Sequence, residues 1–273
     1  MKKPEEAMSR VQSQLQKDPQ NIGLMAEVSR IYMIIGKKKE AIENANRMID
    51  RKPDVPAGYL MLALVYQNQQ QIDSAIEVLK RAAGLNDRNV NMMLGGLYQA
   101  KRDFKNALDI YRSVEKRNPS YAPAIYQQGA VYHAMGKVRE ASIQYSRALK
   151  VSGNFLPALN NLAYIYAEEG RDLDKAMQYA ARAYVLAPND GSVLDTFGFV
   201  LLKNKKNKDA LQVLKKASDR MPANPTVLYH LALAYRENAD KAQAVSSLQK
   251  AIQIGKFPDE KNARILLAKL QKG

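Results

Sequence analysis

The segment LNNLAYIYAEEGRDLDKAMQYAARAYVLAP, residues 159–188, decides the fold. Apolar residues recur at helical spacing from Leu159 to Tyr166, and the polar run at residues 168–171 is typical of a turn. A second amphipathic run follows from Ala176 to Ala187 and ends at a proline. The segment therefore predicts two helices joined by a short turn.

The same pattern returns along the chain with a period near 34 residues. Alanine marks one slot of the second run, with spacings of 32 to 35 residues, and tyrosine marks a slot of the first run, where Leu201 fills the gap. The alanines are Ala41, Ala75, Ala107, Ala141, Ala176, Ala210 and Ala244, and the tyrosines are Tyr32, Tyr66, Tyr98, Tyr132, Tyr166 and Tyr235. A shared period in two residue types predicts a repeat array rather than separate globular domains.

The repeated residue types have physical reasons. Two antiparallel helices that cross closely leave room only for a small side chain, which explains the alanine slot. A proline cannot continue a helix but is well suited to begin the next one, which explains why prolines recur between units.

The repeat resembles the tetratricopeptide repeat, a helix–turn–helix unit of 34 residues. The residues that match its pattern in one unit are Tyr59, Leu62, Ala63, Tyr66, Ala75, Leu79 and Ala82, and two further units match in the same way. The resemblance implies an all-α fold, a right-handed α–α superhelix of about seven repeats. We expect the repeats at residues 22–55, 56–87, 88–121, 122–155, 156–190, 191–224 and 225–258.

The two ends of the array differ from its repeats. Residues 1–21 match only a second helix, so we expect half a repeat, cut from a longer array or following an export signal. Such a half repeat would leave an apolar edge for self-association. Residues 259–273 predict one amphipathic capping helix with Ala263, Leu266, Leu267 and Leu270 on one face.

The later repeats have a narrower resemblance. Residues 159–176, with one extra residue in their turn, and the runs 186–190 and 192–198 resemble bacterial envelope lipoproteins of exopolysaccharide export and the exosortase (PEP-CTERM) system. This resemblance implies a periplasmic or outer-membrane-attached protein if a signal has been removed, and a cytoplasmic protein otherwise. A lipoprotein anchor needs a cysteine, and the sequence has none.

Composition excludes several kinds of chemistry. The absence of cysteine excludes disulfides and zinc–thiolate sites, and His133 and His230 are too few for a three-histidine metal site. The sequence contains no phosphate-binding loop, no dinucleotide fingerprint and no hydrolase motif. Gly95 and Gly96 lie within an expected helix, which favours close helix packing. We therefore expect neither an enzyme nor a cofactor, and no apolar run is long enough for a membrane span.

In the family's geometry the first helices line a concave groove, so one stripe of each first helix is the candidate binding surface for a partner protein or peptide. Its mixture of amides, aromatic rings and methionine suits an extended or helical segment. An alternative role for its apolar positions, such as Leu64, Ala130 and Leu233, is packing between first helices. The candidate groove residues are Arg30, Leu60, Gln67, Met92, Gln99, Tyr126, His133, Asn160, Tyr164, Asp195, Phe199, Tyr229 and Arg236.

The net charge of +15 supplies a second hypothesis. Its densest cluster, here called the lysine patch, holds a single acidic residue, Asp209, and spans the turn and second helix of the sixth repeat. The patch predicts an acidic partner, such as an anionic polysaccharide, an acidic protein or membrane phosphate, and less strongly a nucleic acid. An ordinary solvated surface is the alternative. The lysine patch consists of Lys203, Lys205, Lys206, Lys208, Lys215 and Lys216.

Overall fold

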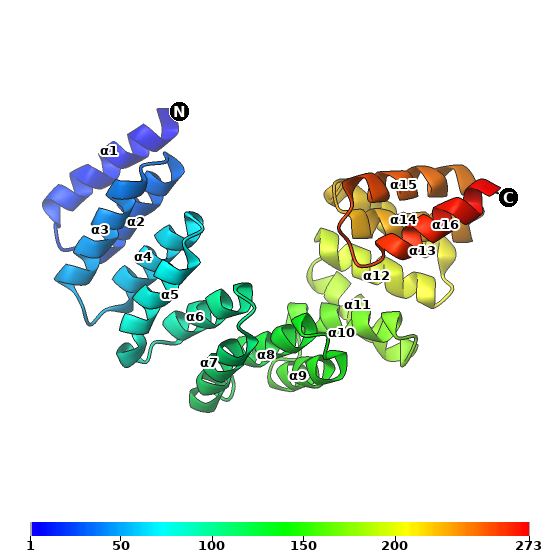
Figure 1. Ribbon diagram of the computed structural model, residues 1–273, viewed down its shortest axis with the longest axis horizontal. Helices are drawn as coiled ribbons and strands as arrows, with labels where there is room; N and C mark the ends of the chain where they lie inside the picture. The colour runs from blue at the N-terminus through cyan, green and yellow to red at the C-terminus, as the bar shows by residue number, and fades with distance from the viewer. Residues whose placement is uncertain (1, 273) are drawn as a thin grey trace. The chain divides into compact units, whose positions relative to one another are not determined.

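The computed structural model describes residues 2–272, with side chains described from residue 4 onward, and it is built of helices and turns throughout that range. The chain divides into two compact units, Met1–Gly136 and Lys137–Gly273, which are drawn in blue to green and in green to red (Figure 1). The expectation of an all-α fold is confirmed. The division falls within the predicted repeat 122–155.

The first unit contains eight α-helices among its described residues. The first helices of the predicted repeats contact one another, α2 with α4 and α4 with α6, while each second helix packs between first helices. The elements are α1 (Lys2–Lys17), α2 (Ile22–Ile34), α3 (Lys38–Arg51), α4 (Pro56–Asn68), α5 (Ile72–Arg81), the short 3₁₀ helix η1 (Ala83–Leu85), α6 (Arg88–Ala100), α7 (Phe104–Arg117) and α8 (Ala122–Ala134).

The second unit repeats this arrangement. Here α10 contacts α12 and α12 contacts α14, so the first helices again form a continuous row. Each predicted repeat range holds two α-helices, and the range 259–273 holds α16. The elements are α9 (Val138–Val151), α10 (Leu156–Glu168), α11 (Leu173–Leu186), α12 (Gly191–Lys203), α13 (Asn207–Arg220), α14 (Pro225–Glu237), α15 (Lys241–Ile254) and α16 (Glu260–Lys272).

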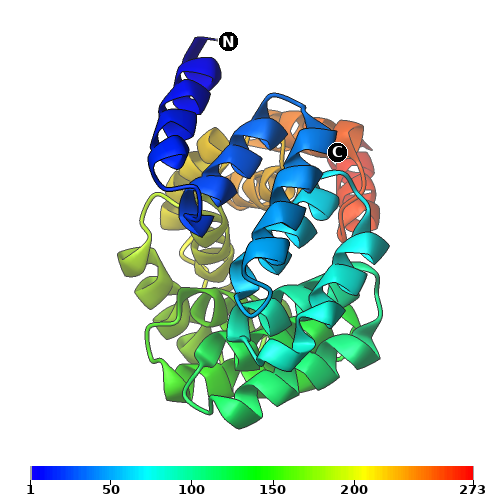
Figure 2. The same cartoon turned by 90° about the vertical axis from the view of Figure 1, so that its left-hand side faces the viewer.

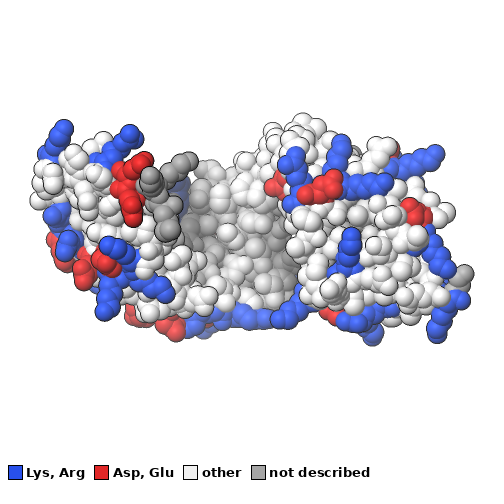
Figure 3. Space-filling view, turned by 90° about the horizontal axis from the view of Figure 1, so that it is seen from above, with Lys and Arg blue, Asp and Glu red and all other residues white. Residues whose placement is uncertain are grey.

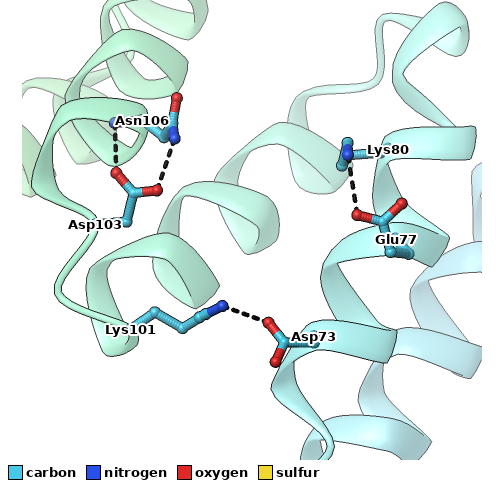
Figure 4. A network of polar contacts seen from close by, with 6 residues as sticks. All are labelled: Asp73, Glu77, Lys80, Lys101, Asp103 and Asn106. Atoms are coloured by element: carbon cyan, nitrogen blue, oxygen red, sulfur yellow. Dashed lines mark hydrogen bonds and ion pairs between the residues drawn. The ribbon is translucent and has the colours of Figure 1, made fainter.

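Helix ends follow the local sequence. Pro56, Pro123, Pro157 and Pro225 occupy the first or second position of α4, α8, α10 and α14. Polar side chains cap the starts of other helices. At the start of α7, Asp103 accepts hydrogen bonds from the backbone and side-chain nitrogens of Asn106 (Figure 4).

Every turn between the two helices of a predicted repeat contains a residue with positive φ. The turns at Gly36, Gly136 and Gly170 use glycine, which adopts this conformation without steric cost. Four others use residues that carry a Cβ: Gln70, Arg102, Lys205 and Ala239. The turn at residues 169–172 is one residue longer than the rest, as the sequence predicts, and Asp172 also has positive φ.

The alanine slots lie at the centre of the packing. All seven alanines of the period have no exposed surface. Glycines add further close approaches: a Cβ placed on Gly95 of α6 would lie 2.6 Å from the Tyr111 ring of α7, and one on Gly198 of α12 would lie 2.5 Å from Leu214 of α13. Gly95 therefore serves helix packing, as predicted.

The terminal helices cover the apolar ends of the two units. Helix α1 lies against α2 (Figure 2) and packs its buried Val11 with Val28 and Ile31. The exposed side chains of α1 are polar, among them Glu6, Arg10, Gln12 and Gln16. The apolar stripe of α1 faces α2, and self-association through this end stays a prediction. Helix α16 covers the other end through Ala263 and Leu266, with Leu267 and Leu270 half-buried, which confirms the predicted face.

Among residues 2–272, the helices are all too short or too polar to cross a membrane.

Candidate functional site

Five of the six candidate groove positions of the second unit form a group with His230 on α10, α12 and α14, and Arg236 lies further along α14. We call it the first-helix cluster, and it consists of Asn160, Tyr164, Asp195, Phe199, Tyr229 and His230. Phe199 is the centre: its ring stacks on Tyr164 with centroids 5.5 Å apart and on His230 with centroids 4.4 Å apart. The ring series joins three consecutive first helices, so these positions act together across repeats.

A buried hydrogen bond supports the rings. The Nδ1 atom of His230 lies 2.9 Å from Oδ1 of Asp195, and both residues are buried. His230 is a packed side chain with almost no exposed surface. Asp195 and His230 lie 35 residues apart, which is about one repeat. The sequence does not show that these two side chains are partners.

Asp195, Phe199 and Tyr229 differ from the sequence expectation. Each is at most 9% exposed, so they support the first-helix surface rather than line an open groove. The reason is the size of the neighbouring side chains: Phe199 is enclosed by Tyr164 and His230, and Tyr229 packs near Phe257 with ring centroids 6.0 Å apart.

Asn160 and Tyr164 retain polar atoms that a partner could engage. The Oδ1 atom of Asn160 is buried and accepts no hydrogen bond from the described residues. Burial raises the pKa of the Tyr164 phenol well above its ordinary value, and the nearby carboxylates of Glu168, Asp259 and Asp195 raise it further. Tyr164 therefore keeps its proton at neutral pH, and this part of the first-helix surface holds a hydrogen-bond acceptor and a donor.

The candidate residues of the first unit are more exposed. Arg30, Gln67 and His133 are exposed, while the remaining four are half-buried: Leu60, Met92, Gln99 and Tyr126. Gln99 also accepts a hydrogen bond of 3.5 Å from the hydroxyl of Tyr111, a side chain of the second helix α7. In the second unit, Arg236 is exposed and paired with Glu237. These positions form a mixed polar and apolar surface within each unit.

Charged side chains cover other parts of the surface. Figure 3 shows Lys and Arg spread over the face it presents, among fewer Asp and Glu. In the first unit, Lys101 pairs with Asp73 between α6 and α5, and Lys80 pairs with Glu77 at 2.9 Å (Figure 4). Both pairs are largely exposed, and such pairs contribute little to stability.

All six residues of the lysine patch are exposed. Two of them lie beside aromatic rings: Lys203 Nζ is 5.1 Å from the ring centroid of Phe199, one turn earlier on α12, and Lys215 Nζ is 5.4 Å from that of Tyr235 in the next repeat. Their contact with protein rings holds these two ammonium groups near the surface.

A basic pocket of the second unit escapes the sequence interpretation altogether. Three of its basic side chains come from α9 and one from the turn after α10. They are Arg139, Arg147, Lys150 and Arg171. The spacing of Arg139, Arg147 and Lys150 along one face of α9 is a signal that could have found part of it. Among residues 2–272, the acidic and histidine side chains form no group that could hold a metal ion.

Known proteins share this repeat. Tetratricopeptide repeat models match residues 60–123 and 126–191, and another matches residues 201–270. The BBSome complex member BBS4 of Bos taurus is 25% identical over 240 residues, which cover 86% of this chain and 45% of that protein. The chain thus spans less than half of that relative.

Two solved structures share the fold at lower identity. The hetero-tetramer Cut9–Hcn1 of the APC/C superposes with a TM-score of 0.73 at 16% identity, covering 96% of this chain and 52% of that chain. The tetratricopeptide repeat protein YrrB, described as having an unusual peptide-binding site, superposes with a TM-score of 0.54 at 24% identity, covering 71% and 99%. Tetratricopeptide repeat proteins generally mediate interactions between proteins. With these repeat models matching most of its length, the chain belongs to the tetratricopeptide repeat family.

Proposed function

We propose that this chain is a non-enzymatic scaffold that binds a protein segment along its first helices. The observation that carries the proposal is the buried Oδ1 atom of Asn160, which has no donor among the described residues. An unsatisfied buried acceptor costs about 1–3 kcal/mol, and a rotation of the half-buried Asn160 side chain that brings Oδ1 to a backbone N–H of a bound segment would remove that cost.

The surroundings of Asn160 suit a polypeptide. Tyr164 supplies a phenol that stays protonated and can donate to a backbone carbonyl. Separately, the first unit carries the exposed amide of Gln67 and the half-buried Met92 on its own first helices, where they suit polar and adaptable apolar contacts. The described peptide-binding site of YrrB is consistent with this use of the fold.

The binding test uses a displayed library of random peptides selected on the purified chain. We expect Asn160→Ala to weaken a selected peptide by about tenfold, which corresponds to about 1.4 kcal/mol. The control is Gln212→Ala, since Gln212 is an exposed amide on the second helix α13. Unchanged affinity in folded Asn160→Ala, or an equal loss in both variants, would overturn the proposal.

We further propose that the scaffold serves a bacterial envelope assembly, secretion or polysaccharide-export complex. The support is the sequence pattern of residues 159–176, 186–190 and 192–198, including the longer turn at residues 169–172. Cell fractionation of the natural gene product tests the assignment. Recovery with the periplasm or the outer membrane is expected, and recovery only in the cytosol would contradict it.

The lysine patch supports a second candidate function, the binding of an acidic polymer. Its six lysines are exposed, and Asp209 is the acidic residue within that stretch. Replacing Lys205, Lys206 and Lys208 by Glu should abolish binding to an anionic polysaccharide such as alginate, and wild-type affinity should fall steeply with added salt. Binding that is independent of both changes would exclude this function.

A further inference from the structure

The turn between α2 and α3 combines exposed apolar side chains with exposed cations. Residues 34–39, Ile-Ile-Gly-Lys-Lys-Lys, are all exposed, and we call them the α2–α3 tip. Ile34 is 73% exposed and Ile35 is 38% exposed, although isoleucine is among the residues most often buried in folded proteins. A Cβ placed on Gly36 would find no atom within 4 Å, so the chain does not cover the tip at that point.

The other turns of the array do not share the two isoleucines. Each first helix ends two residues after its tyrosine slot, or after Leu201 in the sixth repeat, so the last helical residue and the one after it correspond from turn to turn. None of the other six turns has a large apolar residue at both positions, so the fold does not require the pair. The residues at the position of Ile34 are Asn68, Ala100, Ala134, Glu168, Lys203 and Glu237, and those at the position of Ile35 are Gln69, Lys101, Met135, Glu169, Asn204 and Asn238.

Three lysines give the tip a charge of +3, since residues 34–39 include no acidic residue. Among the described side chains, none pairs with Lys37, Lys38 or Lys39. These lysines begin α3, where the positive end of the helix dipole disfavours cations, an effect that Glu40 of the first turn offsets only in part. The three cations therefore do not serve the stability of α3.

An apolar pair beside exposed lysines suits the surface of an anionic bilayer. Apolar side chains of peripheral proteins enter the boundary between headgroups and acyl chains by about 5–10 Å, and nearby lysines are attracted to anionic lipids. The long lysine side chains let their ammonium groups stay among the headgroups while shorter apolar side chains go deeper. A protein interface of standard size involves about 20–30 residues a side, whereas a fluid bilayer accepts a tip of six residues without a complementary shape.

We propose that the α2–α3 tip docks this chain on an anionic lipid bilayer. Ile34 and Ile35 enter the apolar boundary, and Lys37–Lys39 contact the lipid phosphates. This contact needs no membrane-spanning helix. It lies in the first unit, and it is independent of the Asn160 surface and of the lysine patch, which belong to the second unit.

The isoleucines are tested by flotation of the whole chain with vesicles of equal amounts of phosphatidylcholine and phosphatidylglycerol. Ile34→Asn/Ile35→Gln gives this turn the polar pair of the next repeat and should weaken binding at least about fivefold, because apolar burial is lost. The matched control is Val185→Asn/Leu186→Gln, an exposed apolar pair at the end of α11 that no lysines follow, and it should bind like wild type. All four side chains are exposed, so both variants should keep the wild-type melting temperature.

The lysines are tested in the same assay. Lys38→Gln/Lys39→Gln should weaken binding at least about tenfold, because each lysine near an anionic surface strengthens it several-fold. The control Lys116→Gln/Arg117→Gln removes the same charge from exposed positions of α7 and should weaken binding much less. Both differences should persist in the variant of the lysine patch that carries three glutamates, which excludes a contribution of that patch. Vesicles of phosphatidylcholine alone should bind the wild type at least about tenfold more weakly than the mixed vesicles.

A single introduced cysteine reports the depth of the tip, because the sequence has no cysteine of its own. A nitrobenzoxadiazole label on Ile35→Cys should shift its emission to shorter wavelength on mixed vesicles and be quenched by nitroxide-labelled lipid, while a label on Val185→Cys should stay in water. Equal losses in a variant and its control, no binding to mixed vesicles, or a label at residue 35 that stays in water would overturn the proposal. Light scattering without lipid tests a second copy as the occupant: self-association that is lost in Ile34→Asn/Ile35→Gln would also overturn it.

Discussion

His230 and Asp195 form a buried contact between consecutive repeats, with His230 Nδ1 2.9 Å from Asp195 Oδ1. The contact links α14 to α12, and the His230 ring also stacks on Phe199. Side-chain bonds between repeats of this kind supplement the apolar interface on which the stability of a repeat array depends.

Removing either partner should destabilise the second unit. Asp195→Ala leaves a buried nitrogen of His230 without its partner and should lower the free energy of unfolding by about 1–3 kcal/mol. His230→Ala also removes the stacked ring and should cost about 2–4 kcal/mol. Urea unfolding of the two variants and of the double variant forms a double-mutant cycle. A coupling energy below about 0.3 kcal/mol would show that the contact contributes nothing.

Neighbouring glycines of α6 should respond in opposite directions to alanine. A Cβ on Gly95 would meet the Tyr111 ring at 2.6 Å, so Gly95→Ala should destabilise by about 1–3 kcal/mol. A Cβ on the exposed Gly96 would find its nearest neighbour, the Tyr111 hydroxyl, at 3.8 Å. Gly96→Ala should therefore stabilise the helix by about 0.5–1 kcal/mol. Thermal melts of both variants check the pair, and changes of the same sign would contradict the packing.

The positive-φ turns allow a stabilising substitution. Ala239 has φ of 61° and is exposed, so Ala239→Gly should raise the free energy of unfolding by about 0.5–1 kcal/mol. The reverse change, Gly36→Ala at φ of 74°, should lower it by a similar amount. Chemical denaturation measures both. If Ala239→Gly were less stable than wild type, the turn would not have this backbone conformation.

Asp190, which caps the N-terminus of α12, should make part of the free energy of unfolding depend on pH. Hydrogen bonds from the Ser192 hydroxyl and from the backbone N–H groups of Val193 and Ser192 lower the pKa of Asp190 below its ordinary value of 3.8. Because the folded-state pKa is lower than the unfolded one, this stabilisation is full above pH 3.8. It is lost as the pH falls through the folded-state pKa.

Variants of two caps separate this effect from capping itself. Asp190→Ala should cost about 0.5–2 kcal/mol at pH 7, and the difference from wild type should shrink towards about pH 2. Asn224 caps α14 through the same kind of contact, since its Oδ1 accepts hydrogen bonds from the N–H groups of Thr226 and Val227. Asn224→Ala should cost a similar amount that does not change with pH. Unfolding followed by circular dichroism across this pH range provides the measurement, and a constant cost for Asp190→Ala would contradict the ionic contribution.

The sequence alone determined the helices and their order. Two helices that cross closely need a small side chain at a fixed position of each repeat. The regular spacing of Ala41, Ala176 and their counterparts therefore indicates the repeat period. All seven of those alanines are fully buried. The proline positions and the longer turn at residues 169–172 were equally readable, because each depends on the local backbone.

Only the tertiary structure decided which first-helix residues are accessible and which basic side chains line the same pocket. Phe199 is buried because rings from the repeats before and after it cover both sides, and Asp195 finds its partner 35 residues away. Arg171 of the longer turn lines the same pocket as Arg139 and Lys150 of α9, although they lie far apart in the sequence. The burial of one side chain depends on side chains from neighbouring repeats. A periodic sequence pattern specifies where those repeats lie, but it does not specify which pairs of side chains make contact.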